Sequence, residues 1–261
     1  MRIRATVAAV SGALALSAFV APAAHAAGGT PDVTFSNMKV NKGSSMVVGT
    51  TKASFSVTYT VTHAASLPAS DFATVPIIYR GSSVTAPSDL FGSDDAGTCT
   101  AASSTVLNCK DTLVFTVGGD SDLDNAEAGS WTLGAVAADK DDNLNWVGGL
   151  GTTKILRADK LTVNAAPEPV KKGKTVTVTG SLTRANWDTH KYGAYGSQSV
   201  KLQFRKKSST TYTTLKTIKA SSTGALKTTT TATVDGYYRY SFAGSTTSPA
   251  VSATGDYVDV Q

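Results

Sequence analysis

Apolar and polar residues alternate in short runs along most of the chain, and clusters of turn residues separate these runs. Phe55, Val57, Tyr59 and Val61 occupy every second position, with Ser or Thr between them. Residues 200–244 contain several runs of the same kind in succession. This spacing is typical of antiparallel strands that bury one face and expose the other. Because no long window after residue 26 shows helical spacing, we predict an all-β protein.

The first half of the chain has the strand count of an immunoglobulin-like sandwich, about seven short strands with turns between them. The expected strands are residues 33–40, 46–48, 52–63, 75–79, 113–117, 131–137 and 144–156. The run 75–79 is apolar throughout, so we expect it to be a central strand that is buried on both faces.

A change in charge near residue 157 indicates two domains. Residues 27–157 contain 8 Lys and Arg against 13 Asp and Glu, whereas residues 158–261 contain 14 against 6. The linker, residues 157–160, has no Gly, Ser or Pro tether, so we expect little swing between the domains. We therefore predict two tandem immunoglobulin-like antiparallel β-sandwiches, residues 27–157 and 158–261. The excess of Lys and Arg in residues 158–261 has two interpretations. It either attracts an acidic polymer or consists of solvated Lys residues on the exposed faces of Thr-rich strands.

The first 26 residues have the pattern of a cleaved secretory signal peptide. Arg2 and Arg4 precede an apolar run from about residue 5 to residue 20, and residues 24–26 read Ala-His-Ala, a small-x-small cleavage site. The run is too short for a membrane anchor, since a spanning helix needs about 20 apolar residues. We expect a secreted, extracellular protein with no membrane insertion.

Two cysteines, Cys99 and Cys109, agree with export, because an isolated pair in an oxidising compartment is usually a disulfide. The alternative is a metal pair, but no His lies nearby and two thiolates alone make a poor site. Closing so short a loop is expected to stabilise the fold by roughly 2 to 3 kcal/mol. The bond would hold an otherwise irregular and flexible insert, residues 92–108, which is rich in Ser, Thr, Ala and Gly.

The second half resembles a known family. Residues 161–207 read LTVNAAPEPVKKGKTVTVTGSLTRANWDTHKYGAYGSQSVKLQFRKK, and STGALKTTTTATVDGYYRYSFAG and TGDYVDV follow. These segments resemble the C-terminal module of small secreted actinobacterial proteins with bacterial immunoglobulin-like domains. The resemblance covers residues 158–261 well and the first half only loosely. It implies a fold and an exported bacterial origin, and it transfers no catalytic residues, since members lack an assigned activity and some are labelled calcium-binding.

An acidic loop is the candidate metal site. Asp120, Asp122, Asp124 and Glu127 place carboxylates at nearly alternate positions, which suits a hard cation such as calcium. The loop does not match an EF-hand, because its sixth and twelfth positions are not Gly and Glu. A solvated acidic loop without metal is the alternative, and we otherwise expect no cofactor.

Residues 184–198 form an insert that carries the candidate binding aromatics Trp187, His190, Tyr192 and Tyr195. Exposed aromatics can stack on sugars or on a partner protein, or they can cap one end of the sandwich. A third interpretation is an interdomain surface. In an immunoglobulin-type sandwich this insert and the loop 120–127 face each other across the two domains. Charge pairing or calcium would then stabilise the junction, with Asp159, Arg184, Asp188 and Lys191 nearby.

Sequence motifs give little support for an enzyme. The chain after residue 26 has two histidines, His63 and His190, one in each predicted domain, and neither is flanked by a nucleophile motif. Nor does a basic-aromatic motif indicate nucleic acid. We expect a monomeric, non-catalytic binding or structural protein of the cell exterior, with a cell-wall polymer, a glycan or an extracellular protein as partner. The alternatives are a calcium-binding protein and a protease or hydrolase inhibitor that presents the disulfide-closed loop.

Overall fold

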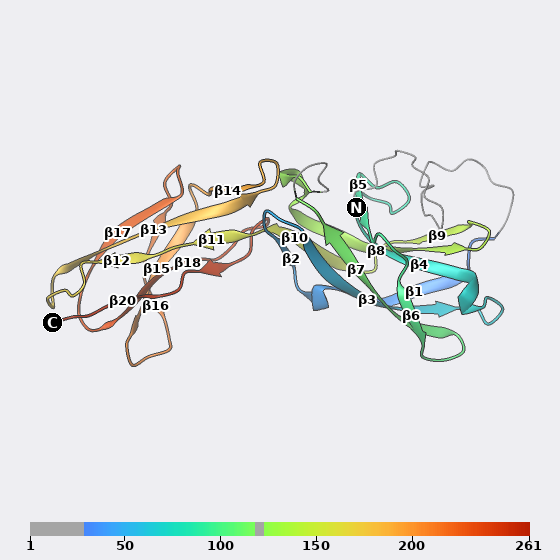
Figure 1. The fold of residues 1–261 in the computed structure, drawn as a ribbon, viewed down its shortest axis with the longest axis horizontal. Coiled ribbons are helices and arrows are strands. Elements are labelled where there is room, and N and C mark those ends of the chain that lie inside the picture. The colour runs from blue at the N-terminus through green and yellow to red at the C-terminus, as the bar shows by residue number, and fades with distance from the viewer. Residues whose placement is uncertain (1–28, 118–122) are drawn as a thin grey trace.

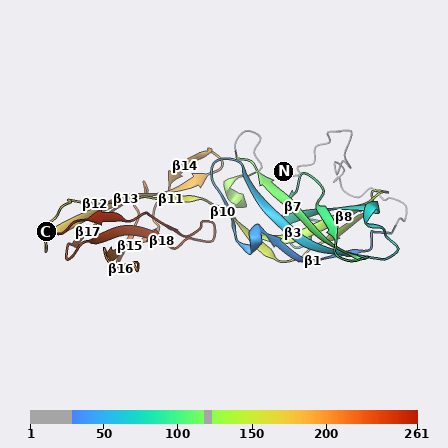
Figure 2. The ribbon, with the colours of Figure 1, turned by 60° about the horizontal axis from the view of Figure 1, so that its bottom comes forward.

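The protein consists almost entirely of strands, as predicted. The computed structural model describes residues 29–117 and 123–261; the expected signal peptide, residues 1–26, and the acidic residues Asp120 and Asp122 lie outside these ranges. Two β-sandwiches lie end to end in an elongated molecule (Figure 1), and the arrangement is equally plain in a view turned by 60° (Figure 2). No helix within these ranges has the length and apolar character needed to span a bilayer.

The first sandwich pairs a four-stranded sheet with a six-stranded one. The four-stranded sheet has the order β1-β3-β7-β6: β1 (Val33–Val40), β3 (Ala53–His63), β7 (Val106–Phe115) and β6 (Thr98–Ala101). The facing sheet has the order β2-β10-β8-β4-β5, with β9 on β8: β2 (Met46–Val48), β10 (Thr152–Arg157), β8 (Gly129–Asp139), β4 (Phe72–Arg80), β5 (Asp89–Gly92) and β9 (Leu144–Val147). Three short 3₁₀ turns, η1 (Asn41–Gly43), η2 (Ala69–Asp71) and η3 (Asn125–Glu127), lie between strands.

This strand order is that of the immunoglobulin fold. The strands at the start are shared between the sheets: β1 pairs antiparallel with β3, and β2 pairs parallel with β10. In the lettering used for immunoglobulin domains, β3, β7 and β6 of the first sheet correspond to strands B, E and D. In the second sheet, β10, β8 and β4 correspond to strands G, F and C. The prediction of an immunoglobulin-like sandwich is therefore confirmed by topology.

Burial follows the alternation in the sequence. In β3, Val57, Tyr59 and Val61 are buried between exposed or half-exposed Ser and Thr residues. In β4, six consecutive residues are buried, which confirms the expected central strand. The outer side of β4 is covered because Val75, Ile77 and Tyr79 form a small second cluster with neighbours from β8, β9 and the β4–β5 loop.

The second sandwich has the same plan. One sheet contains β11 (Asp159–Leu161), β12 (Asn164–Ala166), β13 (Thr175–Asn186), β14 (Lys191–Ala194) and β17 (Ala225–Thr231). The other contains β16 (Thr213–Lys219), β15 (Ser199–Lys206), β18 (Gly236–Phe242), β19 (Val251–Ser252) and β20 (Asp256–Val258). Their inner faces meet around Val178, Leu202 and Tyr240, and the Tyr240 hydroxyl donates to the Val178 carbonyl oxygen at 2.8 Å.

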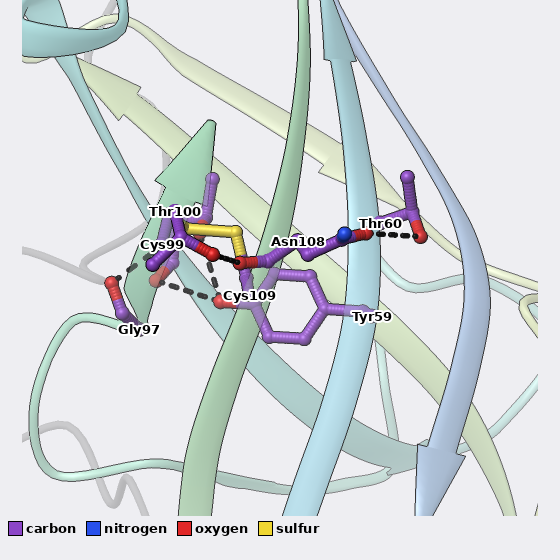
Figure 3. Close-up of a disulfide and its surroundings, with 8 residues drawn as sticks. Tyr59, Thr60, Gly97, Cys99, Thr100, Asn108 and Cys109 are labelled. Carbon is purple, nitrogen blue, oxygen red and sulfur yellow. Dashed lines mark hydrogen bonds between the residues drawn. A yellow bond between two sulfur atoms is a disulfide. The ribbon is translucent and has the colours of Figure 1, made fainter. Parts of the chain in front are cut away.

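Cys99 and Cys109 form the predicted disulfide, but the segment around them is more regular than expected. Cys99 lies opposite Cys109 in the β6–β7 pair, so the bond joins two neighbouring strands (Figure 3). The insert 92–108 is therefore mostly an edge strand and its turn, and not an irregular loop. Beside the bond, the Tyr59 hydroxyl lies 2.9 Å from the Thr74 hydroxyl, which links the two sheets.

Residues 184–198 also differ from the expected irregular insert. β13 is 12 residues long, and β17 pairs only with its first part, Thr175 to Ser181. The last four residues of β13 continue past the end of β17 and pair with β14. The β13–β14 hairpin therefore extends beyond its own sandwich toward the first one, near the middle of the molecule (Figure 1).

Candidate functional site: the junction between the sandwiches

A single residue, Ala158, separates the last strand of the first sandwich from the first strand of the second. Its N–H donates to the Val48 carbonyl oxygen at 2.9 Å, and its own carbonyl oxygen accepts from the Ala185 N–H at 2.8 Å. The neighbouring Arg157 N–H donates to the Thr247 carbonyl oxygen at 3.0 Å. Backbone N–H and C=O groups of the two sandwiches thus form hydrogen bonds with each other at the linker. These bonds restrict rotation of one sandwich relative to the other.

Trp187, from the β13–β14 hairpin, is inserted into the first sandwich. Its side chain is fully buried, and it belongs to the apolar cluster of that sandwich although it comes from the second. The indole Nε1 donates to the Gly49 carbonyl oxygen at 2.9 Å and lies 3.3 Å from that of Val48. An indole buried with its N–H bonded combines a large apolar area with directional anchoring, so Trp187 fixes the position of the hairpin.

Asn125, in η3, bonds to the other side of the hairpin. Its backbone N–H donates to Asp188 Oδ1 at 2.9 Å, and its amide Nδ2 donates to Asn186 Oδ1 at 2.8 Å and to Asp188 Oδ2. Its Oδ1 accepts from the Trp187 N–H at 3.0 Å. One neutral side chain thus uses both its donor and its acceptor groups across the junction.

The η3 turn is rigid because it is capped and clamped. The Asp124 side chain accepts from the Ala126 N–H at 2.8 Å, and Glu127 Oε2 accepts from the Asp124 N–H at 2.8 Å, which together form a capping box. Arg80 donates to the Ala126 and Glu127 carbonyl oxygens at 2.9 and 2.6 Å. Its guanidinium also lies 4.4 Å from the ring centre of Trp131.

These contacts show what the carboxylates of two candidate calcium ligands, Asp124 and Glu127, bind in the structure. Asp124 and Glu127 point their carboxylates at backbone N–H groups of their own turn, which is a structural role. Asp120 and Asp122 lie outside the described residues. Within residues 29–117 and 123–261, no group of three or more His, Cys, Asp or Glu side chains is placed to hold a metal ion.

The four candidate aromatic residues divide into different environments. Trp187 is buried at the junction, so its ring has no exposed face for a ligand. Tyr192 is half-buried against the first sandwich, with Lys160 Nζ 3.8 Å from its ring centre. Tyr195 packs on its own sandwich, under the Arg184 guanidinium at 3.9 Å. His190 is exposed at the hairpin turn, in a left-handed conformation with φ of 56°.

Two charged groups next to the linker, Arg157 and Asp159, are partly or fully removed from water, which costs desolvation free energy. Arg157 is buried, and its Nε donates to the Ala185 carbonyl oxygen at 2.6 Å. Burial raises the pKa of Asp159 to about 6, against the hydrogen bond from Ser248 and the charges of Arg184 and Arg157. Burial, with the like charge of Arg184, lowers the pKa of Arg157. Desolvation therefore outweighs attraction between these groups.

His63 and His190 are in separate environments. His63 ends β3 in the first sandwich, where its ring is buried, packs on Phe72 and places Nδ1 3.0 Å from the Ala64 carbonyl oxygen. His190 is in the hairpin of the second sandwich.

The key junction residue that the sequence did not single out is Asn125. The Asp124-x-x-Glu127 spacing around it is the signature of a capping box and so indicates an ordered turn.

Comparisons with known proteins assign no family. No family model and no curated protein matches the chain. Solved structures with some likeness include dimeric latent PorU from Porphyromonas gingivalis (12% identity, 88% of this chain, 20% of that chain, TM-score 0.30) and the adhesin InvE of Yersinia pseudotuberculosis (11%, 89%, 61%, 0.28). The D00–D0 domain of intimin is a third (13%, 86%, 99%, 0.27). The chain thus spans a fifth of the PorU chain, and at these TM-scores the likenesses assign neither fold nor function.

Replacing Trp187 by Ala should lower the free energy of unfolding by about 3 to 5 kcal/mol, because it leaves a cavity in the first sandwich and removes the indole anchor. Urea denaturation measures the change. The matched control is His190→Asn in the same hairpin, which keeps a residue that tolerates the left-handed conformation and should change stability by less than about 0.5 kcal/mol. Equal effects of the two substitutions would contradict the assignment of Trp187 as the anchor.

Replacing Asp159 by Asn should raise the thermal midpoint at pH 7.5 and have no effect at pH 4. The pKa of Asp159 in the folded protein, about 6, lies above the usual value near 3.9, so the fold favours the protonated form. The contribution of Asp159 to the free energy of unfolding is therefore fully present below about pH 4 and is lost as the pH rises through about 6. Asn imitates the protonated side chain and keeps an acceptor for Ser248. Calorimetry at both pH values tests this, and a lower midpoint at pH 7.5 would show the sign to be wrong.

Proposed function

We propose that this protein is a non-catalytic binding protein of the cell exterior, in which the junction holds two sandwiches as one rigid unit. The observation that carries the proposal is the burial of Trp187 between the sandwiches. Binding and catalytic clefts commonly lie at domain interfaces. Here Trp187 and Tyr192 fill that place, so the outer faces of the sheets are the surfaces left for a partner.

Two features support an exterior location. The Cys99–Cys109 disulfide is stable in oxidising compartments and rare where thiols are kept reduced. The first 26 residues also have the pattern of a secretory signal peptide.

The outer face of the first sandwich suits a hydroxyl-rich partner. An open groove of about 520 Å³ lies over β1, β3, β6 and β7. Among its lining residues are Asn37, Thr60, Thr100 and Asn108, whose amide and hydroxyl groups match the hydrogen-bonding groups of a sugar. A cell-wall polymer or another glycan is therefore the partner class that we favour over a protein.

The test is co-sedimentation of the purified protein with insoluble bacterial cell wall. We expect saturable retention, above that of an unrelated protein of equal size and net charge, and no release of soluble sugar or peptide from the wall. Release of such products would indicate an enzyme and would contradict the non-catalytic assignment. Absence of retention would remove the cell wall as the partner.

A further inference from the structure

The outer face of the β16-β15-β18-β20 sheet is cationic, and it is the outer face of this sandwich that carries strand arginines. Inward positions of β15 and β18 are filled by core residues such as Val200, Leu202 and Tyr240. The alternate positions include Lys201, Arg205 and Arg239, and the strand positions on this outer face carry no Asp or Glu. On the opposite sheet, the outward positions of β13 from Thr175 to Thr183 are Thr or Ser, and Lys160 and Lys227 lie beside them on β11 and β17.

Six side chains on this face form a continuous row, which we call the Arg–Tyr row. Arg239 lies 3.8 Å from the ring centre of Tyr212, and Arg205 lies 5.5 Å from the same ring and 3.8 Å from that of Tyr237. The Tyr237 and Tyr257 ring centres are 5.1 Å apart, and Lys207 Nζ lies 5.2 Å from Tyr257. Each cation therefore packs on at least one ring, and the row joins β15, the turn that follows it, β18 and β20.

Among the described residues, the guanidinium groups of Arg205 and Arg239 have partners for only a minority of their N–H donors. Arg239 Nε donates to Gln203 Oε1 at 2.8 Å, and Arg205 Nη1 donates to the Ser209 carbonyl oxygen at 2.9 Å. Lys207 lies 3.9 Å from Asp235, whereas neither arginine is within ion-pair distance of a carboxylate in the described part of the chain. Each guanidinium has five N–H donors, so both can still bind an anion in a bidentate manner.

The row is also held in place before any partner binds. Stacking on Tyr212 and Tyr237 restricts both arginines, and Tyr212 is itself packed against Gly255, where a Cβ would collide with its hydroxyl. Side chains that are already ordered lose less conformational entropy on binding. An unneutralised, ordered pair of guanidinium groups is thus a receptor for anionic groups.

We propose that the Arg–Tyr row binds an anionic polysaccharide, a proposal that rests on the binding function proposed above and names its partner class. The arginines bind the acidic groups of the polymer, and the Tyr237 and Ser241 hydroxyls, at outward positions of the same strand, bind its sugar hydroxyls. Nucleic acid fits less well, because the ring faces that bases would stack on are occupied by cations or by each other. The net positive charge of residues 158–261 attracts such a polymer to this sandwich.

The experiment is titration of the full chain with polygalacturonate, measured by calorimetry at fixed ionic strength, with dextran as the neutral polymer. Arg205→Gln together with Arg239→Gln should weaken binding about tenfold or more, since both substitutions remove charge-assisted hydrogen bonds to the polymer. The matched control, Lys154→Gln with Lys227→Gln, also removes two positive charges from exposed strand positions and should change the affinity less than twofold. Arg205→Lys with Arg239→Lys keeps the charge but lacks the planar fork, so its binding should be intermediate.

Several results would overturn the proposal. These are no binding of polygalacturonate by the wild-type protein, equal weakening in the test and control pairs, or tighter binding of polyphosphate or single-stranded DNA at equal charge concentration. If the glutamine variant does not fold, as judged by circular dichroism, the lysine variant supplies the comparison, and wild-type affinity in it would contradict the role of the guanidinium groups. If the wild type and the glutamine variant are both retained on cell wall, the protein has the proposed binding function, but the Arg–Tyr row is not its binding site.

Discussion

The arrangement of the molecule depends on one side chain of the second sandwich that is buried in the core of the first. Trp187 extends the first apolar cluster across the linker, and its Nε1 is bonded to the Gly49 carbonyl oxygen at 2.9 Å. The long strand β13 delivers it there, because its last four residues pass the end of β17 and return as β14. Asn125 and the backbone bonds of Ala158 then hold the same hairpin from the other sides.

A junction fixed in this way determines which surfaces remain for a partner. The space between the sandwiches is filled. The charged groups beside it, buried Arg157 and half-buried Asp159, are oriented by backbone and hydroxyl groups of the protein itself. The outer faces of the sheets are left, and they differ in chemistry. The first sandwich presents an open groove with Thr, Asn and Lys side chains in its lining, and the second presents the Arg–Tyr row. Because Trp187, Asn125 and Ala158 bond across the junction, the structure holds both faces at one separation.

The alternation of residues predicted the all-β class, and the apolar run 75–79 predicted the buried strand β4. The change in charge near residue 157 predicted two sandwiches, and the isolated cysteine pair predicted the disulfide. Period-two patterns report on burial directly, and β3 is the clearest case, with Val57, Tyr59 and Val61 inward. Two segments were predicted as irregular and are strands, β6 and the β13–β14 hairpin, since Thr-, Ser- and Gly-rich edges carry a weak pattern. Asn125 and the Arg–Tyr row depend on which strands become neighbours in space. That information lies in the topology, and no local spacing contains it.

The central claim is that the two sandwiches form one rigid body, and the distance between them tests it most directly. Spin labels at Ser56→Cys on β3 and Thr229→Cys on β17 are on exposed outward positions of different sandwiches, away from the junction. Pulsed electron double resonance then gives the distribution of the distance between them. A rigid junction predicts one narrow distribution, as wide as the labels' own rotamers allow. A broad or bimodal distribution in the intact protein would contradict the account.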